Sequence, residues 1–175
     1  MPVDPRRNSR RLLDGPDRAV ARGMMKAIGF TDETLPWAPW LDTVDLAQAT
    51  PAQLAALDEM SPTARQSPYF LLLAHQPEVL LHRSVAFNAI MFAPGGLSRA
   101  ERELGATVES RLNGCVYCTS VHAQRFTQLA RRNDVIAQLF QDPADAGADA
   151  RERAVVRFSA RLGLQPHLLA AADVA

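Results

Sequence analysis

The pattern of apolar and polar positions predicts a chain built from helices. Beyond Thr50, apolar residues recur at the three- and four-residue spacing of a helical face, and the strict alternation typical of half-buried strands is absent. Prolines stand where a first helical turn would begin, at Pro51, Pro68 and Pro77. The sequence therefore predicts an all-α fold.

Caps and breaks place the ends of the helices. Ser98-Arg99-Ala100-Glu101 has the form of a capping box, and Asn113-Gly114 is a helix stop. The next helix, over about 115–131, contains both cysteines. Residues 1–18 are expected to form a mobile arm and residues 19–175 a single helical domain. The other expected helices cover about 19–28, 51–60, 68–75, 77–92, 98–112, 133–141 and 149–162.

Two stretches are too apolar to face only water. The predicted helix over 77–92 has apolar residues on more than one stripe, which indicates a helix buried centrally or at a subunit interface. The segment Thr31–Val44 carries both tryptophans, Trp37 and Trp40, and its two prolines exclude a long helix. We expect it to cover the protein's own core, with packing on a partner subunit as the alternative. The sequence thus predicts a homo-oligomer, a dimer or larger.

Composition and charge narrow the class of protein. Nineteen basic residues balance nineteen acidic ones, so no basic field points to nucleic acid or to an anionic membrane. No apolar run reaches the length of a membrane span, and the charged N-terminus lacks the apolar region of a secretory signal. We therefore expect a cytoplasmic protein. In a reducing cytosol, a cysteine pair is more often catalytic or metal-binding than structural.

The candidate chemistry lies between Asn113 and His122, where both cysteines and one of the four histidines occur. Cys115 and Cys118 are three residues apart and His122 follows after four more, so a helix places all three side chains on one face. The helix N-terminus stabilises a thiolate at Cys115, and His122 can accept a proton from Cys118. A thiolate that attacks a peroxide becomes a sulfenic acid, which the second cysteine resolves to a disulfide.

Two other interpretations of this cluster exist. Two thiols and an imidazole could hold zinc, but the fourth ligand would have to come from elsewhere in the chain. The cysteines could also be inert core residues beside a structural histidine. His75, His82 and His167 stand apart from the cysteines and are expected to be structural.

The predicted helix over 98–112 has a core stripe of Leu104, Val108 and Leu112. Glu103 is rotated by about 100° from Leu104, so periodicity assigns it to the surface. Glu109 is likewise expected to be solvated.

The run Leu97–Leu104, followed by Asn113–Cys118 and His122, resembles the alkylhydroperoxidase D-like family, whose superfamily also contains the carboxymuconolactone decarboxylases. The stretches His75–Leu80 and Phe87–Met91 look like its uncharacterised peroxidase-related branch. The resemblance covers about residues 60–142 and implies that family's helical bundle. Relatives usually continue beyond Ala175 with further helices, whose absence would leave a buried face for a partner.

The resemblance implies a relay of Glu103, Cys115, Cys118 and His122. In this scheme Cys118 attacks the peroxide and Cys115 resolves it and accepts electrons. Glu103 orients and polarises His122, which overturns the surface interpretation. Tyr117 takes the place of a second histidine in the family's founding peroxidase and would support the site as a hydrogen-bond donor.

The implied function is a thiol-dependent peroxidase that reduces hydroperoxides and is regenerated by a thiol or protein reductant. It would need no cofactor and no metal. One alternative is a decarboxylase-type lyase or isomerase that works by acid–base catalysis without a redox pair. Another is a non-enzymatic oligomeric module that keeps the motif for its structure.

Overall fold

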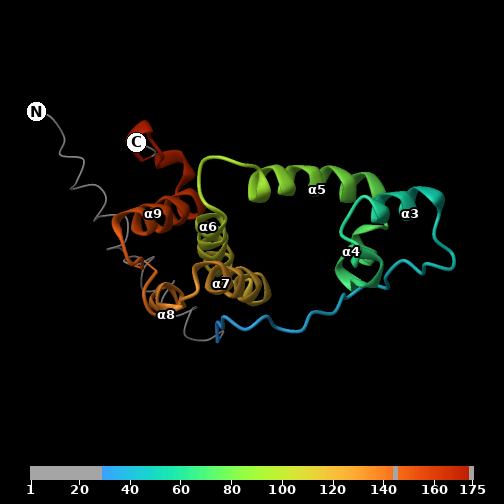
Figure 1. Cartoon of the computed structure of the whole chain (residues 1–175), viewed down its shortest axis with the longest axis horizontal. Coiled ribbons are helices and arrows are strands. Elements are labelled where there is room, and N and C mark those ends of the chain that lie inside the picture. The colour runs from blue at the N-terminus through green and yellow to red at the C-terminus, as the bar shows by residue number, and fades with distance from the viewer. Residues whose placement is uncertain (1–28, 144–145, 174–175) are drawn as a thin grey trace, which may run out of the picture. The chain divides into compact units, whose positions relative to one another are not determined.

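Every element of the described chain is helical, so the all-α prediction is confirmed (Figure 1). The computed structural model describes residues 29–143 and 146–173. The arm predicted over 1–18 and the helix predicted over 19–28 lie outside the described residues. The helices are α3 Pro51–Asp58, α4 Pro68–Leu73, α5 Pro77–Phe92, α6 Arg99–Leu112, α7 Val116–Ala130, α8 Asp134–Gln141 and α9 Ala150–Leu164, with 3-10 turns η1 Ala64–Gln66, η2 Pro166–Leu168 and η3 Ala171–Asp173.

The chain divides into two compact units. The central unit, Pro36–Gly95, holds α3 to α5. The C-terminal unit holds α6 to α9 and, among the described residues before Pro36, also includes residues 29–35. Each unit has its own hydrophobic core, and the expectation of a single domain over 19–175 stays a prediction.

The predicted helix caps are present. Thr50 and Gln53 form a capping box at the start of α3. At α6, Ser98 Oγ accepts a hydrogen bond from the Glu101 N–H, and Glu101 Oε2 accepts one from the Ser98 N–H. These bonds satisfy backbone donors that a helix N-terminus otherwise leaves open. The capping box therefore fixes where α6 begins, and with it the position of every side chain on that helix.

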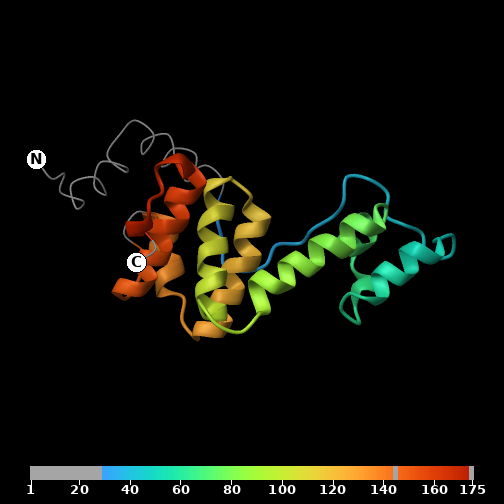
Figure 2. The same ribbon diagram turned by 90° about the horizontal axis from the view of Figure 1, so that it is seen from above.

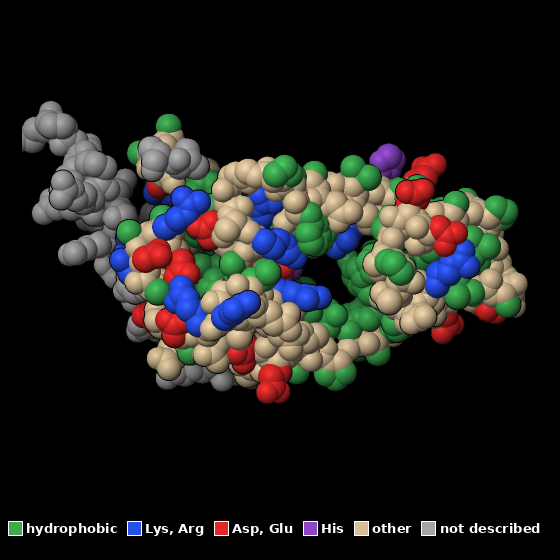
Figure 3. Space-filling view, viewed as in Figure 1, with side chains coloured by type: hydrophobic (Ala, Val, Ile, Leu, Met, Phe, Trp, Pro, Cys, Tyr) green, Lys and Arg blue, Asp and Glu red, His purple; other side chains and the backbone are tan. Residues whose placement is uncertain are grey.

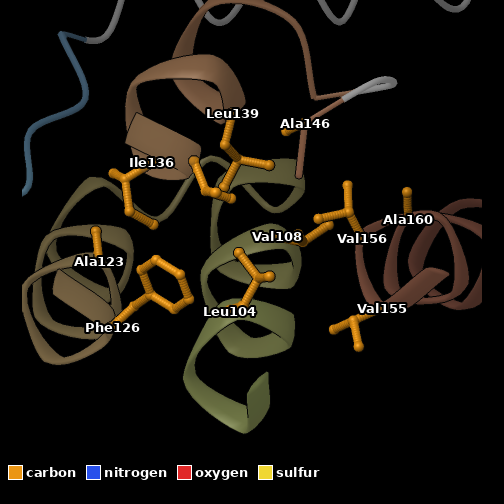
Figure 4. Packing of buried hydrophobic residues seen from close by; sticks show 11 residues of the cluster. Leu104, Val108, Ala123, Phe126, Ile136, Leu139, Ala146, Val155, Val156 and Ala160 are labelled. Atoms are coloured by element: carbon orange, nitrogen blue, oxygen red, sulfur yellow. The ribbon is translucent and has the colours of Figure 1, made fainter. Parts of the chain in front are cut away.

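The core of the C-terminal unit is built around α6. Figure 2 shows α6 beside α7, with α9 along another side. Leu104 and Val108 are buried, as the core stripe predicted, and Leu112 packs against the same cluster. The buried apolar side chains that surround them come from α7, α8, α9 and the loop before α9 (Figure 4): Ala123, Phe126, Val135, Ile136, Leu139, Ala146, Val155, Val156 and Ala160.

The central unit has a smaller core, made by Val44, Ala56, Leu57, Ala64, Ala74 and Leu80. Helix α5 contributes little to it, because only Leu80, Ser84 and Met91 of that helix are buried. Large apolar side chains of α5 are instead exposed, namely Val79, Val85, Ile90 and Phe92. The prediction that this helix is buried within the subunit is therefore not met in the central unit, whereas the interface prediction stays open.

The tryptophan segment is only partly covered. Trp37 packs edge-on against Tyr69, with ring centroids 5.7 Å apart, while Trp40 is fully exposed. Figure 3 shows a run of hydrophobic side chains at the surface along the extended segment that precedes α3. Among the described helices, none combines the length and the apolar character that crossing a membrane requires.

Glu109 corrects one expectation from the sequence. Its carboxylate lies over Gly163 of α9, so close that a Cβ added at Gly163 would stand 2.5 Å from Glu109 Oε2. Burial raises the pKa of Glu109 above its usual value. The side chain is therefore part of the α6–α9 contact and does not belong to a solvated face.

Candidate functional site

The two cysteines lie where one helix ends and the next begins. Gly114 has φ +70°, and the N–H groups of Gly114 and Cys115 bond to the carbonyls of Arg111 and Ser110. This is a Schellman motif, for which glycine is the preferred residue because it adopts positive φ without steric cost. The Asn113-Gly114 stop thus makes Cys115 the last residue of the short link between α6 and α7.

Cys115 is at the same time the N-cap of α7. Its Sγ accepts a hydrogen bond from the Cys118 N–H at 3.3 Å. The two sulfur atoms are 2.26 Å apart and form a disulfide. In the reduced state, the backbone N–H groups of the first helical turn and the positive end of the helix dipole favour a thiolate at Cys115.

Glu103 and His122 are brought together between α6 and α7. His122 Nδ1 lies 2.6 Å from Glu103 Oε2, and Glu103 is 1% exposed. The surface position that periodicity predicted for Glu103 is wrong, because α7 packs against the flank of α6 on which Glu103 lies. The catalytic role of each residue stays a prediction.

The hydrogen bond assigns the two ring nitrogens of His122. When Nδ1 carries the proton that faces the Glu103 carboxylate, Nε2 carries the lone pair of the neutral ring. Cys118 and His122 lie four residues apart on α7, the spacing at which helical side chains are neighbours. The side chain of His122 is 21% exposed, so protons from solvent can reach it. This arrangement suits a base that accepts a proton from Cys118.

The second carboxylate oxygen of Glu103 also has a partner. Oε1 lies 2.5 Å from Nη2 of Arg99, one turn earlier on α6. Sequence reasoning considered Arg99 only as a member of the capping box. The signal that could have found it is its i, i+4 spacing from a buried carboxylate.

Both ends of α6 are anchored. At the N-terminal end, a hydrogen bond from Arg151 of α9 lowers the pKa of Glu101, helped by the Ser98 N–H. At the other end Arg111 is buried, donates from Nη2 to the Phe140 carbonyl at 2.7 Å and lies over the Phe30 ring. Burial lowers the pKa of Arg111 to about 10, which leaves it charged at neutral pH. The anchored ends hold Arg99 and Glu103 in a fixed place.

The segment before the central unit braces α7. The Leu35 N–H donates to Ser120 Oγ at 3.1 Å, and Thr34 Oγ1 donates to Gln124 Oε1 at 2.7 Å. These bonds attach residues 34 and 35 to α7, while the expectation that the whole segment covers the protein's own core stays a prediction. Ser120 and Gln124 are turned away from the cysteines by helical geometry, so this contact supports α7 from behind.

The remaining predicted residues lie apart from this cluster. Tyr117 is half-buried on another face of α7 than the two cysteines, and its supporting role stays a prediction. His75 Nε2 lies 2.8 Å from the Asp42 carbonyl, which is a structural contact, while His82 and His167 are exposed. Within residues 29–143 and 146–173, no three His, Cys, Asp or Glu side chains gather into a possible metal site.

Known proteins are similar to this chain in sequence over its second half and in fold. The model of the carboxymuconolactone decarboxylase family matches residues 78–161, from α5 to α9. A solved structure from Ralstonia eutropha, described as an alkylhydroperoxidase AhpD core and an uncharacterized peroxidase-related protein, superposes with a TM-score of 0.62. The match has 23% sequence identity and covers 83% of this chain and 74% of that one, so it shows the fold. No curated protein matches the sequence.

Proposed function

We propose that this chain, whose residues 78–161 form a carboxymuconolactone decarboxylase family domain, is a thiol-dependent peroxidase that reduces hydroperoxides. One observation carries the proposal. Cys115 and Cys118 form a disulfide at the N-terminus of α7, and one turn later on the same helix His122 is hydrogen-bonded to the buried carboxylate of Glu103. The group supplies a nucleophile, a resolving thiol and a base. In this proposal the protein works in the cytoplasm, where thiol reductants are available.

The reaction balances with these residues, the hydroperoxide and an external thiol or protein reductant. The Cys118 thiolate attacks the outer oxygen of a hydroperoxide, an S–O bond forms, the O–O bond breaks, and the alkoxide takes a proton and leaves as alcohol. Cys115 then attacks the sulfenic sulfur, and water leaves as the disulfide forms. A thiol or protein reductant returns two electrons and two protons. His122 would accept the Cys118 proton and deliver it to the leaving oxygen.

We keep Cys118 as the attacking thiol because His122 is its neighbour on the helix. The N-cap position of Cys115 favours the opposite order, since it stabilises a thiolate there. Single variants separate the two. With Cys115→Ser, peroxide should leave a sulfenic acid on Cys118 that a trapping reagent labels, and Cys118→Ser should give no comparable label on Cys115.

Hydrogen peroxide added to the reduced protein should consume both thiols of each chain. The expected product is an intramolecular Cys115–Cys118 disulfide, because the two sulfurs are already within bonding reach. Thiol titration before and after peroxide, with mass spectrometry of the non-reduced peptide, measures this. If both thiols stay titratable under excess hydrogen peroxide and an organic hydroperoxide, the peroxidase proposal fails.

The chain should also self-associate, as a dimer or larger. The exposed apolar side chains of α5 and the exposed Trp40 form surfaces that a monomer in water rarely keeps open. Light scattering should give at least twice the 19.1 kDa of one chain. Val85→Glu should shift the protein toward monomer, whereas Leu168→Glu, a control exposed leucine in η2, should not. A stable monomer across micromolar concentrations would contradict this.

A further inference from the structure

We propose that Arg99 is a positioning residue of the relay: its guanidinium compensates the buried charge of Glu103 and turns that carboxylate toward His122. This rests on the proposed peroxidase function, which it extends by one residue. The motivating geometry is a carboxylate with one partner on each oxygen, Arg99 Nη2 at 2.5 Å from Oε1 and His122 Nδ1 at 2.6 Å from Oε2.

Helix energetics alone do not account for the pair. Arg99 is the first residue of α6, where the helix dipole disfavours a positive charge. The order of the pair, with the basic residue before the acidic one at i and i+4, is also the weaker of the two orders in an isolated helix. A pair that served only to stabilise α6 would have both features reversed. The placement of Arg99 is explained instead by what Glu103 requires.

Glu103 requires a counter-charge because its side chain is only 2% exposed. A buried carboxylate without one is strongly destabilised and tends to acquire a proton. Beside His122 alone, Glu103 would draw that proton onto the imidazole, which would then be a cation and not a base. Arg99 supplies the positive charge without using the proton, so the neutral imidazole stays available to Cys118.

The guanidinium also fixes the rotation of the carboxylate. With Oε1 bound to Arg99, Oε2 is the oxygen left for Nδ1 of His122. The Arg99 side chain is 26% exposed, so it lies between solvent and the buried acid. Its effect on the chemistry passes through Glu103 and His122, and no contact with substrate is needed.

Arg99→Met keeps the length of the side chain and removes its charge. We expect oxidation of the reduced thiols by hydrogen peroxide to slow about tenfold at pH 7. The acid limb of the pH–rate profile should move up by about one pH unit, because one unit corresponds to a tenfold change in the fraction of free base. Arg99→Lys should recover most of the rate, since it restores the charge. Arg65→Met is the matched control, because it removes an arginine bonded to a carboxylate, Asp58, in the central unit and leaves α6 and Glu103 untouched.

An NMR titration of the imidazole rings tests the inference without peroxide. In Arg99→Met the titration midpoint of His122 should move to higher pH, while His75, His82 and His167 serve as unchanged internal references. If Arg99→Met does not fold, Arg99→Gln, which keeps a polar group in the first turn, takes its place.

The two readouts separate the two proposals. If the wild-type thiols do not react with peroxide, the proposed function fails and the NMR titration still decides on Arg99. If the wild type reacts but Arg99→Met matches it in rate, profile and titration, Arg99 is not a positioning residue. A slower rate that Arg99→Lys does not recover, with an unmoved His122 titration, would show a merely structural role and also overturn the inference.

Discussion

His122→Ala should slow the oxidation of the reduced thiols by hydrogen peroxide by about 10²–10⁴-fold at neutral pH, the usual worth of a general base. The cause is the loss of the group that accepts the Cys118 proton, since a thiol reacts only as thiolate. A free cysteine has a pKa of about 8.5, so raising the pH should ionise the thiol without help and shrink the defect. Stopped-flow thiol loss across pH 6 to 9 measures both effects.

Glu103→Gln should slow the same reaction by a smaller factor. The amide has the shape of the carboxylate but only one acceptor oxygen, and it must face two donors, Arg99 Nη2 and His122 Nδ1. Whichever donor meets the amide nitrogen loses its hydrogen bond. His75→Ala is the control, because that ring bonds to a backbone carbonyl in the central unit. Unchanged rates in both His122→Ala and Glu103→Gln would leave these residues a purely structural pair.

Local signals predicted the helices well, because caps and breaks act over only a few residues. The Ser98 capping box, the Asn-Gly stop and the prolines at helix starts are all observed. The face shared by the cysteines and His122 follows from helical geometry, so it too could be read from spacing. The start of α7 at Val116 places Cys115 one residue outside the helix, at its N-cap.

Positions that depend on tertiary packing could not be read in this way. Periodicity assigned Glu103 to the surface because it assumes one buried stripe, whereas α6 is covered by both α7 and α9. The burial of Glu109 was missed because its carboxylate occupies space left open by Gly163, which has no side chain and lies far away in the sequence. Polar residues in such places are found only once the neighbouring helices are in position. The family resemblance did indicate Glu103, because it carries information about a shared packing.

Phe126→Ala should lower the free energy of unfolding of the C-terminal unit by about 3–5 kcal/mol, the usual cost of removing a buried aromatic ring. Phe126 is 1% exposed, and its ring points from α7 toward Leu104 of α6, near Ile136 of α8 (Figure 4). The cavity would lie among α6, α7 and α8, whose other buried side chains keep these helices in place, so it could close only in part. Phe126→Leu keeps most of the volume and should cost about 1–2 kcal/mol.

Urea unfolding followed by circular dichroism measures these differences, with Phe87→Ala in the central unit as the matched control for losing a half-buried ring. Phe126 lies one turn after His122 on α7, so the same variants test how the site is held. The relay is also held by contacts that do not involve Phe126, namely the anchored ends of α6 and the Glu103–His122 hydrogen bond. The folded fraction of Phe126→Ala should therefore react with peroxide within about threefold of wild type, far less than the 10²–10⁴-fold expected when a general base is removed. A destabilisation below about 1 kcal/mol would contradict the core assignment of Phe126, and a loss of rate as large as that of His122→Ala would show that α7 is positioned by its core packing.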